Sequence, residues 1–78
     1  VAISIHQAAN LPHQAFFADA EVIFRRHQGR PHWGKMHSLA CRELRELYPH
    51  WDRFLAVRSR LDPQGRFLNE HLRRLFVD

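Results

Sequence analysis

The stretch VAISIHQAANLPHQAFFADAEVIFRRHQG, residues 1–29, determines the fold class that the sequence predicts. Its first six residues alternate, with Val1, Ile3 and Ile5 on one side of an extended backbone. Alternation of β-branched residues with a period of two is typical of a half-buried strand. We therefore expect a strand over residues 1–6, although no second strand-like run follows with which it could pair. Its sheet is expected in sequence absent from this chain or, alternatively, in another copy of it.

A long amphipathic helix is expected next, opening at Leu11-Pro12 and ending before Gly29. Proline suits the first turn of a helix, where its missing N–H has no partner to lose. Apolar residues then recur with helical spacing, at Phe16, Phe17, Ala20, Ile23 and Phe24. Gly29 followed by Pro31 predicts the end of this helix, because glycine accepts a left-handed backbone and proline cannot continue the helix.

The remaining residues predict a loop followed by three short helical pieces. Residues 30–38 show no regular period, whereas residues 39–48 and 51–58 return to helical spacing. Asp-Pro-Gln-Gly at 62–65 places its residues as a type I turn requires, and Asn69 is positioned to cap a last helix. The predicted fold class is an α+β fragment with one strand, one long helix and short helices.

Composition excludes several classes of protein. The chain has 78 residues and one cysteine, so it cannot hold an internal disulfide. No apolar run is long enough for a transmembrane helix, and no signal peptide is visible. The expected location is the cytoplasm, with peripheral association with a membrane as the alternative.

Positive charge is concentrated in the middle of the chain. Of the 12 basic side chains that give the net charge of +4, six lie in residues 25–45 against Glu43 alone. Cations beside Trp33 could bind nucleic acid through phosphate contacts and base stacking. However, basic side chains are mostly solvated surface, and one tryptophan makes no stacking platform. We therefore expect no nucleic acid, and keep an autonomous basic helical module that binds nucleic acid or a protein as the alternative function.

A metal site is a second interpretation of the same stretch. His27, His32, His37 and Cys41 could supply four nitrogen and sulfur ligands. Their spacing matches no common zinc module, and ordinary polar roles for these histidines explain the pattern more simply. No metal site is predicted.

The third interpretation is an active-site loop at His32-Trp33-Gly34-Lys35. An imidazole, an indole, a glycine and the chain's only lysine follow one another here. Glycine lets the backbone approach a ligand closely, and a lysine ammonium can stabilise negative charge on an oxygen or a cofactor ring. Spacing alone does not separate this loop from a surface lysine beside a buried tryptophan.

Longer motifs around this loop resemble the C-terminal end of the aldonolactone oxidase and alditol oxidase family. The similar pieces are GRPHWGKMHSL at 29–39, LYP at 47–49, LDPQGRFLN at 61–69 and HL at 71–72. These vanillyl-alcohol-oxidase-type flavoproteins include the L-gulono-1,4-lactone and D-arabinono-1,4-lactone oxidases. The resemblance covers essentially the whole chain, although family members often have tyrosine where this chain has His71.

The resemblance implies that residues 1–78 are the C-terminal fragment of an FAD-dependent oxidase whose FAD-binding domain lies in absent upstream sequence. It implies oxidation of a sugar 1,4-lactone or an alditol at a C–H bearing a hydroxyl. Hydride would pass to flavin N5, and oxygen or another acceptor would take the electrons. The fragment alone is expected to be inactive.

The resemblance also implies which residues form the site. Lys35 and His32 are the expected catalytic residues, with Lys35 near the flavin and the substrate hydroxyls. Trp33, Gly34 and Asn69 are expected close to the substrate or the cofactor. For Asn69, a simple helix cap is an equally strong interpretation.

Overall fold

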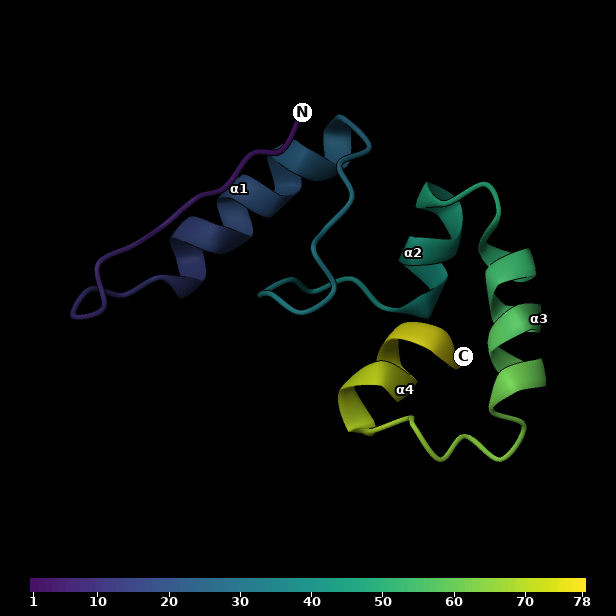
Figure 1. Cartoon of the computed structure of the whole chain (residues 1–78). Helices are drawn as coiled ribbons and strands as arrows, with labels where there is room; N and C mark the ends of the chain where they lie inside the picture. The colour runs from purple at the N-terminus through teal and green to yellow at the C-terminus, as the bar shows by residue number, and fades with distance from the viewer.

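The computed structural model describes all 78 residues and contains four α-helices and no strand. The helices are α1 (Gln14–Arg26), α2 (Cys41–Leu47), α3 (Trp51–Leu61) and α4 (Glu70–Phe76). In Figure 1, α2, α3 and α4 gather at one end of the molecule, and α1 lies apart from them at the other. The loop between α1 and α2 joins the two parts.

The strand expected over residues 1–6 is wrong, and the fold is all-α rather than α+β. This segment follows an extended path along α1 in Figure 1, but its backbone makes no ladder hydrogen bond. Val1 and Ile3 are exposed. A strand exists only through hydrogen bonds to a neighbouring strand, and no other segment of this chain supplies one. Alternation of side chains is therefore not sufficient to make residues 1–6 a strand, and the segment has no regular secondary structure.

The end of α1 is a Schellman motif that differs in one residue from the expectation. Gly29 N donates to Phe24 O at 2.7 Å, and Gln28 N donates to Arg25 O at 3.0 Å. The left-handed residue is Gln28, with φ of 55°, rather than the expected Gly29. Glycine is needed at 29 for a different reason, because a Cβ there would lie 2.9 Å from Phe24 O.

Only part of the apolar face of α1 packs against the rest of the chain, and none of its residues is fully buried. Phe17 and Phe24 are half-buried, whereas Phe16 and Ile23 are 45% and 55% exposed. One carboxylate ties this helix to the following loop, since Ser38 N donates to Glu21 Oε1 at 2.8 Å. The expected apolar stripe is therefore present, but much of it faces solvent.

The core lies where α2, α3 and α4 meet. Leu44 and Leu75 are completely buried, and Trp51 is 2% exposed. Leu39 and Cys41 complete the buried set, and half-buried apolar side chains pack around it: Trp33, Leu47, Tyr48, Leu55, Leu72 and Phe76. Five buried residues make a small core, so each of them carries a large share of the stability.

The turn and the cap expected before the last helix are both confirmed. Gly65 N donates to Asp62 O at 3.1 Å, and Gly65 has a positive φ of 65°. The Asp62 carboxylate accepts from the backbone N–H groups of Arg66 and Phe67 at 2.8 and 3.0 Å. Asn69 Oδ1 then accepts from Leu72 N at 2.8 Å and caps α4.

The chain is extended for its size. Its radius of gyration is 14.6 Å, against about 11.5 Å for a compact domain of this length. Its accessible surface is 6657 Å², against about 5,000 Å² for a compact monomer of its mass. No helix is both long and apolar enough to cross a membrane.

Replacement of Leu44 by alanine should lower the free energy of unfolding by about 2 kcal/mol or more, because a fully buried leucine leaves a cavity. Urea denaturation followed by circular dichroism measures this change. Leu61, a leucine that is 74% exposed, provides the matched control, and Leu61→Ala should cost no more than about 0.5 kcal/mol. Equal losses in the two variants would contradict the core described above.

Candidate functional site

Lys35 lies at the tip of a tight loop between α1 and α2. Lys35 N donates to His32 O at 3.1 Å, which closes the turn that carries it. Its side chain is exposed, and its ammonium makes no hydrogen bond or ion pair within the chain. Met36 beside it is 69% exposed. The loop therefore presents a free positive charge to whatever lies next to it.

His32 shapes this turn through its own ring. Gly34 N donates to His32 Nδ1 at 3.0 Å, so that nitrogen acts as an acceptor in the turn. A Cβ at Gly34 would meet only the His32 ring, at 3.3 Å, and Gly34 is exposed. His32, expected to be catalytic, thus has an observed structural task, while Gly34 leaves the backbone approachable.

The Trp33 side chain packs against the core. Its ring lies 5.2 to 5.8 Å, centroid to centroid, from four other aromatic rings: Tyr48, Trp51, Phe54 and Phe76. Three of these four contacts are edge-on, an arrangement that aromatic rings favour. Trp33 anchors the loop that carries Lys35 to the rest of the structure.

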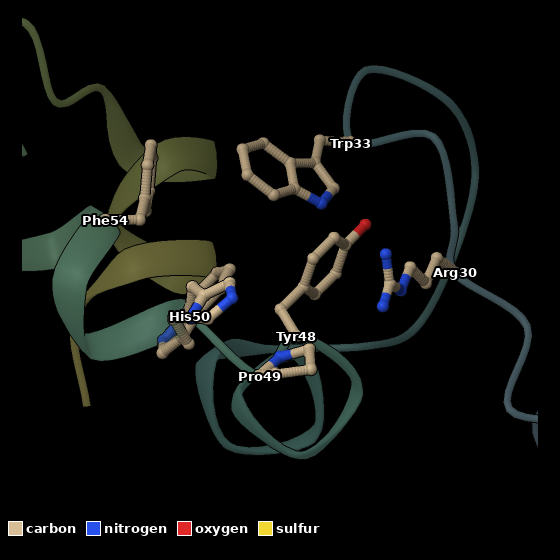
Figure 2. Close-up of a pocket in the computed structure, with 7 residues that line it drawn as sticks. Arg30, Trp33, Tyr48, Pro49, His50 and Phe54 are labelled. Carbon is tan, nitrogen blue, oxygen red and sulfur yellow. The ribbon is translucent and has the colours of Figure 1, made fainter.

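A shallow apolar pocket of about 350 Å³ lies beside Trp33 (Figure 2). Tyr48 and Phe54 wall it, and Arg30 stands at one side with its guanidinium carbon 4.6 Å from the centre of the Tyr48 ring. Arg30 Nε also donates to Leu47 O at 3.0 Å, which fixes the guanidinium in place. Lys35 does not line this pocket, so the aromatic pocket and the lysine tip are separate features.

Three side chains that were not predicted as site residues hold the base of the loop. His71 Nε2 donates to Trp33 O at 2.8 Å, and Arg74 Nη2 donates to His37 O at 3.3 Å. Glu21 accepts from Ser38 N on the other side, as described above. Since these partners lie 17 to 38 residues apart in the chain, no local pattern could have indicated them.

His37 is the most enclosed histidine of this loop. Both of its ring nitrogens are buried without a hydrogen-bond partner. Burial lowers the pKa of His37, and the positive charge of Arg74 lowers it further. His37 thus packs within the loop with both ring nitrogens unpaired.

The residues considered for a metal site do not come together. No point in the structure is surrounded by three His, Cys, Asp or Glu side chains suited to hold a metal ion. Cys41 lies in the core, where burial raises the pKa of its thiol.

Asn69 is engaged as the cap of α4 and belongs to the same side of the molecule as the loop anchors. It lines an open hollow together with Glu70, His71 and Arg74. Its amide oxygen is taken by Leu72 N. Its expected place near a substrate or cofactor stays a prediction.

A family model described as D-arabinono-1,4-lactone oxidase matches residues 1–75. This match confirms the resemblance inferred from the motifs at 29–39 and 61–69. No solved structure matches the chain.

Among characterised proteins, L-gulono-1,4-lactone dehydrogenase of Mycobacterium tuberculosis (strain ATCC 25618 / H37Rv) is 49% identical over 73 residues, which cover 94% of this chain and 17% of that protein. L-gulonolactone oxidase of Scyliorhinus torazame is 41% identical over 66 residues, covering 85% of this chain and 15% of that protein. Alditol oxidase of a Streptomyces species is 46% identical over 46 residues, covering 59% and 11%. The chain thus spans about a sixth of the length of the first two of these relatives.

The turn before α4 should lose stability in acid. Backbone N–H groups, that of Phe67 first and that of Arg66 as well, hold the pKa of Asp62 below its ordinary value of 3.8. A carboxylate whose pKa is lower in the folded state stabilises the fold above pH 3.8, and this contribution disappears as the pH falls through the folded-state pKa. Urea denaturation at neutral pH and below pH 3.8 should show a smaller acid loss for Asp62→Asn than for the unchanged chain. The same loss in both would show that Asp62 does not contribute.

Proposed function

The chain belongs to the D-arabinono-1,4-lactone oxidase family, and we propose that it is the C-terminal part of an FAD-dependent oxidoreductase. Its substrate is a sugar 1,4-lactone or an alditol, oxidised at a carbon that bears a hydroxyl. Oxygen or another acceptor takes up the electrons. The observation that carries the proposal is the exposed, unpaired Lys35 on a braced loop within a segment matched over residues 1–75.

The surface of the chain supports a role as part of a larger polypeptide. Phe16 and Ile23 on α1 are 45% and 55% exposed, and Phe67 is 82% exposed. Large apolar side chains gathered on one helix face, as on α1, normally pack against another surface. Because the two lactone-acting relatives are each about six times longer than the matched segment, the proposed cover for this face is the rest of the same polypeptide.

The residues of this chain fit a contact with a flavin but not a complete FAD site. The three glycines, at 29, 34 and 65, are isolated, so no glycine-rich loop is available to bind a pyrophosphate. The aromatic pocket is shallow and does not include Lys35. What the chain offers is the open backbone at Gly34 and the free ammonium beside it. Both are suited to touch a flavin or a substrate held mainly by another domain.

In this proposal Lys35 supplies positive charge and a hydrogen-bond donor where negative charge develops. A bound FAD would supply the hydride acceptor for oxidation of the alcohol. The ammonium stabilises negative charge on a substrate oxygen or on the neighbouring ring, and its three donors can rotate to fit a hydroxyl. His32 and Gly34 keep the turn tight, and Trp33 fixes its base to the core.

The test of Lys35 uses a hybrid protein in which this chain replaces the matching 73 residues of the Mycobacterium tuberculosis relative. With L-gulono-1,4-lactone and a dye acceptor, Lys35→Ala should lower turnover about 100-fold, because loss of one preorganised charge contact typically costs that much. The FAD content, measured by absorbance, should not change. Arg42→Ala, which removes an exposed basic side chain from α2, serves as the control for altered surface charge and should leave turnover unchanged. Unchanged turnover in Lys35→Ala would overturn the role of this lysine.

The 78-residue chain by itself should not retain FAD. Since the proposed FAD site lies in another domain, flavin mixed with the chain should elute separately in gel filtration, with absorbance at the flavin bands following the free cofactor. Co-elution of flavin with the chain would contradict the proposal that another domain holds the FAD.

A further inference from the structure

We propose that α4 sets the position of Lys35, with His71 and Arg74 as positioning residues for the lysine tip. The lysine tip is defined as residues Gly34 to Met36. This inference rests on the proposed role of Lys35 and adds which side chains the site needs in order to hold that lysine in place. Neither positioning residue touches the lysine, and both act through the backbone on either side of it.

The two hydrogen bonds from α4 bracket the lysine tip. His71 Nε2 reaches Trp33 O at 2.8 Å, two residues before Lys35, and Arg74 Nη2 reaches His37 O at 3.3 Å, two residues after it. His71 and Arg74 are three residues apart on a helix and therefore lie on one face. A single helix face thus holds both ends of the tip.

Helix α4 can act as a brace because it is itself fixed. Leu75 is fully buried, and Leu72 and Phe76 pack against the core. Asn69 caps its first turn at 2.8 Å. The face that carries His71 and Arg74 is solvent-exposed, so these side chains are available for the loop without belonging to the core.

Apart from the two bonds from α4, the hydrogen bonds at the lysine tip are all within its own turn. Its bonds, Lys35 N to His32 O and Gly34 N to His32 Nδ1, are local and move with the loop. Glu21 holds Ser38 from the side of α1, outside the tip. Without the bonds from α4, the Trp33 ring and Ser38 would remain anchored, but the carbonyls next to the tip would be free.

Ordinary packing of a helix on a loop would give similar contacts without any effect on the lysine. Matched variants separate the two cases. Gln at position 71 can place an N–H donor where His71 Nε2 lies, whereas Met has a similar length and no donor. Arg74→Met removes the second donor, and Arg73→Met removes an equal charge from the same helix without touching the loop.

The first experiment measures the backbone order of Gly34 and Lys35 in the 78-residue chain by nitrogen-15 relaxation. Order parameters near about 0.85 are expected for the unchanged chain, for His71→Gln and for Arg73→Met. Values below about 0.6 are expected for the double variant His71→Met, Arg74→Met. Unchanged order in the double variant would overturn the proposal. Circular dichroism establishes that each variant remains helical.

The second experiment measures turnover in the hybrid protein described above. The double variant should lose about ten-fold to a hundred-fold in kcat, since a displacement of about 1 Å can have that effect. KM should change less than kcat, and His71→Gln alone should stay close to the unchanged protein. Loss of order at the tip with unchanged kcat would overturn the positioning role.

The two experiments fail independently. If the hybrid with the unchanged chain shows no lactone oxidation, the proposed function fails, and relaxation still decides whether α4 orders the tip. If order at the tip is unaffected while the hybrid is active, the proposed function stands and the positioning role is wrong.

Discussion

The burial of Leu75 among Leu44 and Trp51 is the contact on which the candidate site depends. Helix α4 has seven residues, and helices this short are unstable in water without tertiary contacts. Its formation therefore rests on this buried leucine, assisted by the Asn69 cap and by the turn that Asp62 organises. Once formed, α4 meets the loop between α1 and α2, and a local helix cap becomes linked to the geometry of a lysine far away in the sequence.

One end of the molecule is well packed, and the other is open. Helices α2, α3 and α4 share the core, whereas α1 contributes no fully buried side chain. The loop carrying Lys35 lies between them and is held from both sides, through α4 and through Glu21 of α1. The lysine therefore sits at a junction, where packing of α1 against a further domain would bring that domain close to it.

Features decided by near neighbours could be predicted from the sequence, and features decided by distant partners could not. The long helix, the turn before α4 and the Asn69 cap follow from residues a few positions apart, and all three were predicted. The strand over residues 1–6 was wrong because alternation reports a side-chain pattern and not the hydrogen bonds that define a strand. At the end of α1, the sequence indicated a glycine but not its reason, which is close approach to Phe24. The family resemblance predicted a role for Lys35, whereas the contacts of His71 and Arg74 with its loop are visible only in three dimensions.

The two tryptophans make this junction observable by fluorescence. Trp33 and Trp51 are the only tryptophans of the chain, and their ring centres lie 5.8 Å apart in one aromatic cluster. All tryptophan fluorescence of the chain therefore originates at the point where the lysine loop meets the core. Because the Trp33 ring packs against the core, its emission reports on that packing. Detachment of the loop is thus observable as a change in emission, without any added label.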